Sequence, residues 1–395
     1  MLTGKTVVIG ITGSIAAYKT AYLVSALKKQ HCDVHVIMTK NACEFIAPLT
    51  FETLTGNKCL VDTFDRDFKF DVTHISIAKK ADLIMVAPAS ANVIAKFANG
   101  IADDMLTTTV LASKALKLVS PAMNTNMYQN PITQENLNKL KGYGFEIINP
   151  ATGLLACNDI GEGKMPEPEV LFEYVLKHLA MPHDLTGKKV IVTAGPTQEA
   201  IDPVRYITNH STGKMGYALA KACMLRGASV TLVSGKTSLK PPMFVDVINI
   251  TSSKEMYEAV CSNFQDADIV FKAAAVADYT PAVTYDNKVK KKDDDLAIPL
   301  KRTDDILKHL GSIKKDGQVL CGFSMETENM LENSQAKLIK KNVDMIVANN
   351  LKVPGAGFGT DTNIVTLITK DNFQELPIMS KFDTANAIIT KALSI

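Results

Sequence analysis

The sequence predicts an α/β protein made of two doubly wound, parallel-sheet domains in tandem. Short apolar, β-branched runs alternate with segments of helical periodicity along the whole chain, the pattern of strands joined by helical crossovers. The 395 residues exceed the usual size of one domain, and 46% of them are hydrophobic, enough for two cores. The pattern also restarts in mid-chain, at an apolar run that begins at Val190. We therefore predict domains at residues 1–184 and 185–395, connected by the polar segment MPHDLTG.

The composition argues against several classes of protein. The 43 basic and 41 acidic residues leave a net charge of +2, without the basic field that a nucleic-acid-binding surface needs. The chain begins MLTGKTVVIG, with no cationic leader, and no apolar run is long enough to span a bilayer. We expect a cytoplasmic protein with no nucleic-acid or membrane partner. The seven cysteines show no CxxC or His-rich spacing, which predicts free thiols and no structural metal.

The first half opens with a strand, a turn and a helix. Residues 5–10 have the character of a buried strand, GITGS follows as a turn, and residues 15–29 form a helical pattern before a second strand at 34–39. The apolar face of this helix is expected to include Ile15, Tyr18, Tyr22, Leu23, Ala26 and Leu27. Because such units bind ligands at the carboxyl ends of their strands, Gly13 and Ser14 are placed to meet a phosphate. By itself this signal is weak, since many α/β proteins begin in the same way without binding a nucleotide.

Two further strands of the first half end in polar segments. The strand at 82–86 leads into PASAN, which offers Ser90 and Asn92 to a ligand, although Ser90 is about equally suited to cap the next helix. LKLVSPAMNTNMY then carries Asn124 and Asn126 beyond another strand, and the glycine-rich GLLACNDIGEGKMPEP follows. Three strand ends with small and polar residues predict one shared pocket.

The second half repeats the alternation of strands and helices. Strands are predicted at 190–193, 230–233, 245–250 and 269–274, and helices at 213–226, 253–264 and 382–393; a further helix at 168–179 ends the first half. The segment FGTDTNIVTLIT is expected to complete the edge of the sheet.

The connection after the strand at 190–193 is unusually polar. It holds Gln198, Asp202, Arg205, Asn209 and His210, and a connection of this length inside an α/β unit is more often functional than a plain loop. Gly213 and Gly216 would let the helix that follows approach an anion closely. The segment is neither a Walker loop nor a GxGxxG motif, so the kind of phosphate ligand stays open at this point.

Residues 1–180 carry five motifs, in the order GITGSIAAYK, PASANVIAK, GIADD, PAMNTNMY and ACNDIGEGKMPEP. In this order they resemble the flavin-dependent cysteine decarboxylases, and Asn124 in PAMN with Cys157 in the glycine-rich flap indicates the phosphopantothenoylcysteine branch. Tyr128 departs from that pattern, because a tryptophan is common there. The resemblance implies bound FMN, the electron sink that loss of carbon dioxide from a cysteine amide otherwise lacks. It implies FMN contacts at Gly13, Ser14, Thr39, Ser90, Ala91, Asn92 and Val93, and substrate contacts at Asn124, Gly161, Gly163, Lys164 and Met165.

Two residues of the first half are implied to be catalytic. His74 has no metal-type partner at helical spacing, and a lone histidine is more often structural, but the resemblance places it at the flavin face as the group that manages the thiol proton. Cys157 lies among glycines and polar residues rather than in a core-like strand. A thiol is mostly protonated near neutral pH, so the resemblance gives Cys157 the role of general acid beneath a closing flap.

The stretch VIVTAGPTQEAIDPVRYITNHSTGKMG resembles the ligase half of the bifunctional phosphopantothenoylcysteine decarboxylase/phosphopantothenate–cysteine ligases of coenzyme A synthesis. The resemblance implies CTP as co-substrate, Mg²⁺ at Asp278, Lys288 as an essential lysine, and Asn209 as the residue for attack by cysteine on an acyl-cytidylate. On local grounds Asp278 also suits a turn, and KVKKKDDD a solvated hairpin. The implied CTP contacts are Lys272, Ala273, Ala274, Asp278, Lys288, Asp304, Asp305, Ile306, Leu307, Phe323, Lys337 and Lys341.

These features together predict a bifunctional enzyme with two Rossmann/flavodoxin-like domains. A regulatory protein on a decarboxylase-like scaffold is the main alternative, disfavoured because His74, Asn124 and Cys157 occur together. A tandem nicotinamide dehydrogenase is disfavoured by the missing GxGxxG in both halves. The resemblance also implies a homo-oligomer, with trimeric contacts between decarboxylase domains and dimeric contacts between ligase domains.

Overall fold

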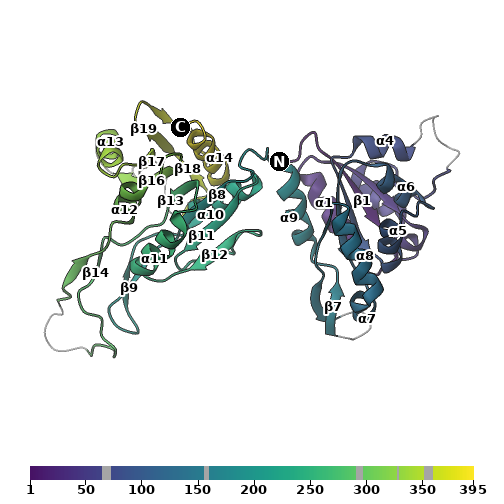
Figure 1. The fold of residues 1–395 in the computed structure, drawn as a ribbon, viewed down its shortest axis with the longest axis horizontal. Helices are drawn as coiled ribbons and strands as arrows, with labels where there is room; N and C mark the ends of the chain where they lie inside the picture. Colours follow the sequence, from purple (N-terminus) through teal and green to yellow (C-terminus); the bar gives the residue numbers. More distant parts are fainter. Residues whose placement is uncertain (65–72, 155–159, 291–296, 327–328, 351–358) are drawn as a thin grey trace. The chain divides into compact units, whose positions relative to one another are not determined.

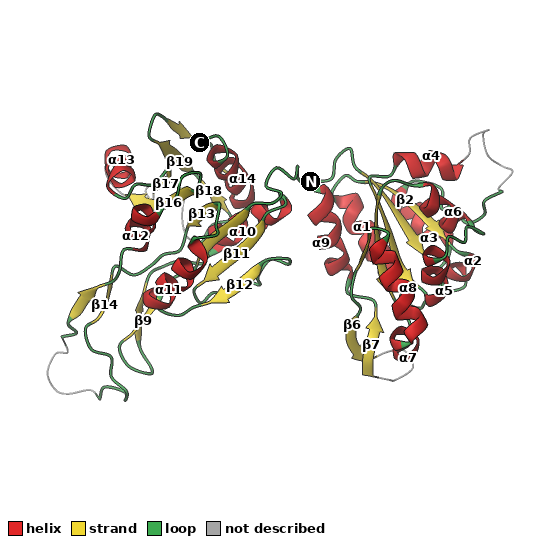
Figure 2. Cartoon of the chain, viewed as in Figure 1, coloured by secondary structure: helices red, strands yellow, loops and turns green. Residues whose placement is uncertain are grey.

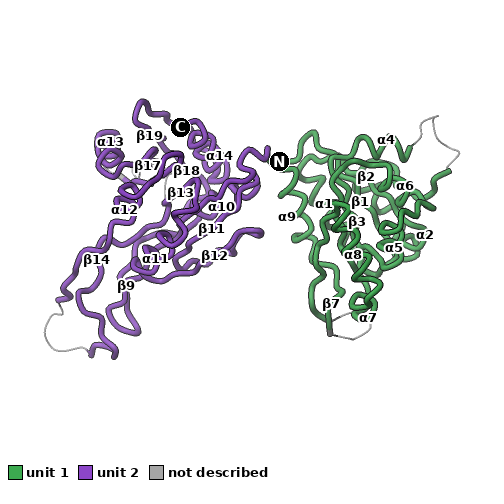
Figure 3. Tube along the Cα trace, viewed as in Figure 1, with its two compact units in different colours: residues 1–181 green, residues 182–395 purple. Residues whose placement is uncertain are grey.

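The structure is a computed structural model, and it describes residues 1–64, 73–154, 160–290, 297–326, 329–350 and 359–395. The chain divides into two compact units, residues 1–181 and 182–395 (Figure 3). Both are α/β units in which helices and strands alternate (Figures 1 and 2). The predicted fold class is confirmed. Among the residues described, no helix combines the length and the apolar character needed to cross a lipid bilayer.

Unit 1 is built on a five-stranded sheet in the order β2-β1-β3-β4-β5, and every neighbouring pair is parallel. Its strands are β1 (Thr6–Ile11), β2 (Asp33–Met38), β3 (Leu83–Ala89), β4 (Leu116–Pro121) and β5 (Phe145–Ile147), with a separate hairpin of β6 (Ala151–Leu154) and β7 (Ile160–Lys164). Its helices are α1 (Ala17–Lys29), α2 (Lys40–Cys43), α3 (Pro48–Thr55), α4 (Thr73–Lys80), α5 (Ala91–Ala98), α6 (Met105–Ala112), α7 (Thr125–Gln129), α8 (Pro131–Gly142) and α9 (Pro168–Leu179).

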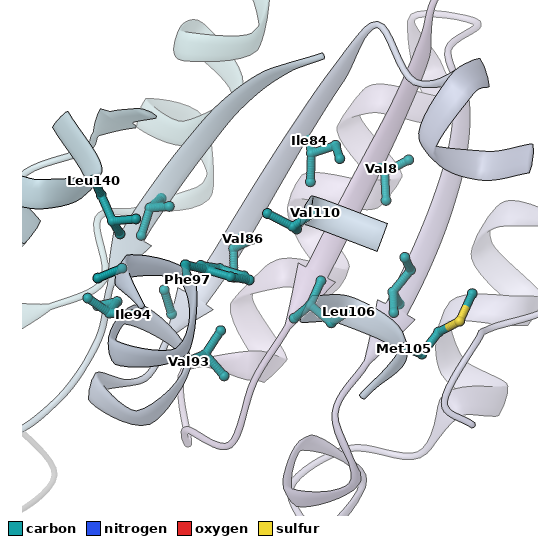
Figure 4. Close-up of a cluster of buried hydrophobic side chains, with 14 of the residues drawn as sticks. Val8, Ile84, Val86, Val93, Ile94, Phe97, Met105, Leu106, Val110 and Leu140 are labelled. Carbon is teal, nitrogen blue, oxygen red and sulfur yellow. The ribbon is translucent and has the colours of Figure 1, made fainter. Parts of the chain in front are cut away.

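Helices cover both faces of this sheet. Phe97 and Ile94 of α5, Leu106 of α6 and Leu140 of α8 pack on one face, where they meet Val8 and Val86 of the strands (Figure 4). On β1, Val7 and Ile9 point to the opposite face and are also fully buried, next to α1. Burial on both faces explains why these strands read as continuous apolar runs in the sequence.

The apolar face predicted for α1 is partly wrong. Leu23 and Leu27 are buried as expected, but Ile15, Tyr18 and Tyr22 are 57%, 53% and 68% exposed. The buried face instead includes two polar residues that find partners. Lys19 donates to Glu167 at 2.7 Å, and the hydroxyl of Thr20 donates to the carbonyl oxygen of Ala87 at 2.8 Å. Because these contacts are long-range, the helical pattern alone could not indicate which face turns inward.

Unit 2 contains an eight-stranded sheet in the order β12-β11-β8-β13-β16-β17-β19-β20. Its elements are β8 (Lys189–Ala194), β9 (Gln198–Ala200), β10 (Tyr206–Thr208), α10 (Lys214–Leu225), β11 (Ser229–Ser234), β12 (Asp246–Asn249), α11 (Ser253–Phe264), β13 (Ile269–Lys272), β14 (Tyr279–Pro281), β15 (Leu300–Arg302), α12 (Ile306–Ile313), β16 (Val319–Glu326), α13 (Met330–Lys340), β17 (Met345–Asn350), β18 (Thr362–Asn363), β19 (Val365–Thr369), β20 (Phe373–Glu375), β21 (Met379–Ser380) and α14 (Lys381–Ala392). Helices α11, α12 and α13 cover one face, while α10 packs against β8, β11 and α14.

The sheet of unit 2 is not wholly parallel, which corrects the prediction. The six strands from β12 to β17 are parallel, whereas β19 runs antiparallel to β17 and β20 antiparallel to β19. β20 follows β19 after a short turn at residues 370–372, and a connection of that length allows only an antiparallel pair. The predicted edge segment FGTDTNIVTLIT does reach the sheet, as β19.

The start of unit 2 is fixed by an ion pair. Arg226, whose side chain is 5% exposed, donates through Nε to Asp184 Oδ1 at 2.8 Å and through Nη2 to Asp184 Oδ2 at 2.5 Å. The same guanidinium donates to the carbonyl oxygen of Asn386 and the hydroxyl of Thr390 in α14. Asp184, expected to end the first domain, therefore makes its contacts within unit 2, and the two units divide shortly before it.

We predict that Asp184→Asn destabilises unit 2 by about 2 kcal/mol, because the buried guanidinium loses its charged partner while the half-exposed Asp184 limits the loss. The hydrogen bond from Arg226 lowers the pKa of Asp184, so the contribution is complete above about pH 4 and is lost as the pH falls through the lowered pKa. Thermal unfolding of the full chain, monitored by hydrogen exchange in each unit, measures the stability of the two units separately. The difference in unfolding free energy of unit 2 between wild type and variant should disappear in acid, and the stability of unit 1 should be the same in both proteins.

Asp371→Asn is the matched control, because Asp371 is an exposed carboxylate for which the described residues show no ion pair. An equal loss of stability in this control would mean that the Asp184–Arg226 pair is not the cause.

Candidate functional site

In unit 1 the predicted flavin contacts gather at the carboxyl edge of the sheet. β1, β2 and β3 are parallel neighbours, so the segments that follow them meet at one edge. Thr12, which the sequence analysis did not single out, joins two of these segments. Its hydroxyl donates to the carbonyl oxygen of Pro88 at 2.8 Å and accepts from the Ser90 amide at 2.9 Å. This places the turn that carries Gly13 and Ser14 beside the start of α5.

Several of the predicted flavin contacts have a structural role within unit 1. The Ser90 hydroxyl accepts from the Val93 amide at 3.4 Å and the Thr39 hydroxyl from the Ala42 amide at 3.3 Å, so both residues cap helices. Helix capping, the alternative weighed for Ser90, is therefore present in the structure. Val93 is 2% exposed and packs in the core, so its side chain does not face this edge. Asn92 is exposed and Ser14 half-buried, which leaves both available to a ligand.

The predicted substrate residues come together beside β4. Asn124 follows β4 and caps α7, and the hairpin strand β7 lies against this loop through its two glycines. Gly163 (φ +131°) accepts a hydrogen bond from the Met123 amide at 3.0 Å, and a Cβ there would collide with the Met123 carbonyl oxygen. A Cβ on Gly161 would likewise collide with Thr125 Oγ1. Only glycine permits β7 to approach residues 123–125 this closely, and the hairpin therefore lies next to Asn124.

The other predicted residues of unit 1 are less closely tied to this edge. Met165 is buried, and Lys164 lies 3.9 Å from Glu167, the residue that pairs with buried Lys19. His74 lies half-buried in the first turn of α4. α4 leads directly into β3. Cys157 is outside the described residues.

Unit 2 has a cavity of about 960 Å³ at the carboxyl ends of β8, β13 and β16. Among the predicted CTP contacts, the cavity lining contains Lys272, Ala273, Ala274, Asp278, Asp304, Asp305, Ile306, Leu307, Phe323, Lys337 and Lys341. Asn209 also lines it, and its side-chain amide donates to the carbonyl oxygen of Val276 at 3.1 Å. Lys288 does not belong to the described lining; it is an exposed residue of the segment between β14 and β15.

Helices α10, α12 and α14 begin at this cavity. Asp305 caps α12 by accepting from the Lys308 amide at 3.1 Å, and Gly213 (φ +77°) precedes α10. Amide groups at a helix start attract anions, which suits a phosphate ligand. A Cβ on Gly216 would stand 2.5 Å from the Ala194 Cβ and 2.8 Å from the Thr193 carbonyl oxygen, so this glycine allows α10 to pack on β8. Gly216 also lines the cavity, and its predicted approach to an anion stays a prediction.

The charges in the cavity are mainly lysines. Burial, together with the charges of Lys341 and Lys337, lowers the pKa of Lys272 to about 8, against the opposing effect of Asp305 and Asp278. The Lys341 ammonium lies 2.9 Å from Asp305 Oδ2. Although burial raises the pKa of Asp305, the hydrogen bond from Lys341 and the amide of Lys308 leave it below its ordinary value. The lining has more basic than acidic side chains, so the cavity favours an anion. The carboxylates are Asp278, Asp304 and Asp305, and the lysines are Lys214, Lys272, Lys308, Lys337, Lys340, Lys341 and Lys381.

Other residues that line this cavity were not predicted from the sequence. Lys214 follows Gly213 and was visible in STGKMG, whereas Lys381 lies far along the chain at the start of α14. Burial lowers the pKa of Lys381, and its ammonium donates to the carbonyl oxygen of Thr362 at 3.0 Å. No local motif marks Lys381, because only the folded sheet brings α14 to this edge. Among the described residues, no group of three or more His, Cys, Asp or Glu side chains forms a metal site.

Comparisons with known proteins match both units. Residues 1–180 match the Flavoprotein family, and residues 185–395 match the DNA/pantothenate metabolism flavoprotein C-terminal domain. The chain is 49% identical over 393 residues to the coenzyme A biosynthesis bifunctional protein CoaBC of Bacillus subtilis (strain 168), covering 98% of this chain and 97% of the relative. It is 41% identical over 383 residues to CoaBC of Escherichia coli (strain K12), covering 96% and 94%.

Two solved structures are also similar to parts of the chain. The crystal structure of the C-terminal domain of CoaBC is 44% identical, with a TM-score of 0.46, and covers 53% of this chain and 96% of that chain. A mutant PPC decarboxylase complexed with pantothenoylaminoethenethiol is 29% identical, with a TM-score of 0.39, and covers 43% and 96%.

The fold and the two family matches define the class: a flavoprotein unit joined to a pantothenate-metabolism unit. The chain belongs to the family of bifunctional coenzyme A biosynthesis proteins, CoaBC. The resemblance found in the sequence is confirmed, and the chain is a bifunctional enzyme with a flavoprotein decarboxylase domain and a ligase domain.

We predict that Lys272 controls how anion binding to the cavity depends on pH. Below about pH 8 its ammonium attracts an anion, and above that pH it is neutral. Lys272→Met should therefore weaken the binding of inorganic pyrophosphate by about tenfold at pH 6.5 and by much less at pH 9.5. Calorimetric titration of both proteins at each pH gives this difference without interference from the titration of pyrophosphate itself.

Lys340→Met is the control, because Lys340 lines the cavity at its exposed side and leaves Lys272 in place. This variant should keep the pH dependence of the wild type. The assignment to Lys272 is wrong if Lys272→Met lowers affinity by the same factor at both pH values.

Proposed function

We propose that unit 2 joins cysteine to 4′-phosphopantothenate with CTP, through an acyl-cytidylate, and that unit 1 decarboxylates the product with FMN to give 4′-phosphopantetheine. The observation that carries the first reaction is the anion-attracting cavity, where the lysines and the start of α12 surround a space large enough for a nucleotide. The experiment that tests it is the Asn209 variant described below. Family membership supports both reactions.

In the ligase reaction the lysines are proposed to bind the CTP phosphates while a substrate carboxylate attacks the α-phosphate. Lys272, Lys337 and Lys341 offset the negative charge that develops there. Asp278 is an exposed carboxylate at the cavity, and Mg²⁺ commonly binds one or two carboxylates together with substrate phosphates. We therefore propose Asp278 as the Mg²⁺ ligand. Lys288 stays a prediction that rests on the resemblance, since it lies outside the described lining.

Asn209 is proposed to act in the second half of the ligase reaction. Its side-chain nitrogen already donates to the Val276 carbonyl oxygen, which holds the amide at the cavity. An amide in this position can donate to the acyl carbonyl of the cytidylate as cysteine attacks it.

The residues of unit 1 fit a flavin at the carboxyl edge of the sheet. The Thr125 hydroxyl is buried and has no hydrogen-bond partner among the described residues, next to the two glycines of β7, which favours a polar ligand there. Gly13 and Ser14 would hold the phosphate, and Asn124 the substrate. Bound FMN would supply the oxidation of the thiol-bearing carbon that lets the neighbouring carboxylate leave. His74 is proposed to accept the thiol proton, and Cys157 to return a proton to the product.

The exposed side of α1 supports a homo-oligomer. Ile15, Tyr18 and Tyr22 form an outward apolar surface directly after Gly13 and Ser14. A second copy of the chain that covers this surface would also bury the proposed phosphate site. We propose trimeric contacts here and dimeric contacts between ligase units, both on the basis of the resemblance. The cytoplasmic location stays a prediction.

We predict that Gly163→Ala lowers decarboxylation at least about tenfold, because its Cβ would meet the Met123 backbone and lift β7 from Asn124. Ligation in the same protein should not change. Gly153→Ala is the control. Gly153 lies in β6, opposite Gly161 of β7, and a Cβ there would meet only the Lys164 side chain, at an ordinary contact distance of 3.7 Å. The activities and the visible spectrum of bound flavin measure the effect. Equal losses in both variants would contradict a specific role for the β7 contact.

We predict that Asn209→Asp still releases pyrophosphate once from CTP and accumulates the acyl-cytidylate, because the residue is assigned to attack by cysteine and not to activation. Rapid-quench assays of pyrophosphate and mass spectrometry of the trapped intermediate provide the measurement. Loss of CTP binding in this variant would instead assign Asn209 to the nucleotide and would remove the proposed division of roles.

A further inference from the structure

The turn between β9 and β10 contains a fully buried carboxylate. The side chain of Asp202 is 0% exposed, and its Oδ1 accepts from the amides of Val204 and Arg205, both at 2.9 Å. These two bonds are those of an ordinary turn that begins with aspartate. They account for one carboxylate oxygen, and the second oxygen is used differently.

The second oxygen binds a segment distant in the sequence. Asp202 Oδ2 accepts from the Val289 amide at 3.1 Å, as well as from Arg205 Nε at 3.0 Å and Nη2 at 2.5 Å. Arg205 Nη2 also donates to the Val289 carbonyl oxygen at 3.0 Å. The Asp202–Arg205 pair thus binds both backbone polar groups of Val289, as a neighbouring strand would. The Tyr285 amide, which donates to the Ile201 carbonyl oxygen at 3.0 Å, adds a third attachment.

Val289 directly follows Lys288, the lysine assigned to the ligase reaction. Lys288 is exposed and half-buried Val289 is held, so the structure fixes the backbone and leaves the ammonium free to project. We propose that Asp202 is a positioning residue for the ligase reaction, which fixes the Lys288 segment on the β9–β10 hairpin. This inference rests on the proposed function, because it takes the role of Lys288 from there.

The same hairpin connects the Lys288 segment to Asn209. Arg205, directly before β10, binds the Val289 backbone, and Asn209 directly follows β10. β9 also lies beside β14, the strand that precedes this segment (Figure 1). The Thr208 hydroxyl donates to the Thr197 carbonyl oxygen at 2.7 Å and fixes the hairpin at its base. A displacement of about 1 Å at a reacting group can slow catalysis by about a hundredfold.

The first test is Asp202→Asn, assayed in the full-length protein. Asparagine keeps the shape, but its amide nitrogen is a donor and can accept neither from the Val289 amide nor from Arg205. We expect the kcat of ligation to fall at least about tenfold, with the KM for CTP within about twofold and decarboxylation unchanged. Glu199→Gln is the matched control. Glu199 is a buried carboxylate of the same hairpin, and it accepts from the Ser253 amide at 2.9 Å instead of holding the Lys288 segment. Its ligation rate should stay within about twofold of wild type.

A double variant separates positioning from other effects. Lys288→Gln alone should slow ligation strongly, and Asp202→Asn should add little in that background, because both changes remove the same contribution. Hydrogen exchange in residues 284–290 reports the backbone directly, and it should accelerate in Asp202→Asn but not in Glu199→Gln. If Asp202→Asn unfolds unit 2, Arg205→Met decides, since it removes the bond to the Val289 carbonyl and leaves the Oδ1 bonds of the turn.

Three results would overturn the proposal: a wild-type kcat in Asp202→Asn, the same fold-loss with and without Lys288, or unchanged exchange at 284–290. Full activity of Lys288→Gln is distinguishable from all three. That result would reject the proposed role of Lys288, and with it the kinetic role of Asp202, even where the exchange data show that Asp202 holds the segment.

Discussion

Both units depend on the same constraint, the parallel pairing of their central strands. Parallel strands need a crossover between them, so the segments that follow β1, β2, β3 and β4 in unit 1 leave the sheet at one edge, as do those after β8, β13 and β16 in unit 2. Side chains far apart in the sequence meet there without any dedicated framework. In unit 1 the Thr12 hydroxyl links two such segments, and in unit 2 the Thr193 hydroxyl accepts from the Ala274 amide in the same way. The sites are products of strand order more than of any single motif.

The two edges differ in their electrostatics. The edge of unit 1 is formed by small residues, hydroxyls and side-chain amides, whereas the cavity of unit 2 is dominated by lysines that repel one another. That repulsion adds to burial in lowering the pKa of Lys272 and is only partly offset by Asp305. A polyanionic ligand relieves it, so the mutual repulsion of the lysines favours binding in the ligase cavity. A flavin site has no such need, because most of the ligand is an uncharged ring.

The sequence predicted the elements well and the orientation of some side chains poorly. The helices at 168–179 and 253–264 were predicted at their observed bounds, because their apolar periodicity is local and their starts are marked by Pro168 and by the capping residue Ser252. The exposed face of α1 and the antiparallel strands β19 and β20 were not, since each depends on partners remote in the sequence. For the ligase site, most of the CTP contacts implied by the motifs line the cavity, but Lys381 and the Asp202–Val289 contact could appear only after folding. The role of Gly216 shows the limit of residue type alone, because a small residue serves packing as readily as ligand approach.

The Asp184–Arg226 pair has a mechanical consequence for a two-enzyme chain. Tension along the connection between the units would first reach a residue that is tied to α14 at the opposite end of the ligase sequence, and only afterwards β8. The load would therefore be shared with the C-terminal helix before it reached β8, the third strand of the eight-stranded sheet. Residues inserted before Asp184 would lengthen the connection between the units without straining β8. Residues inserted after Asp184 would instead separate the Asp184–Arg226 pair from β8.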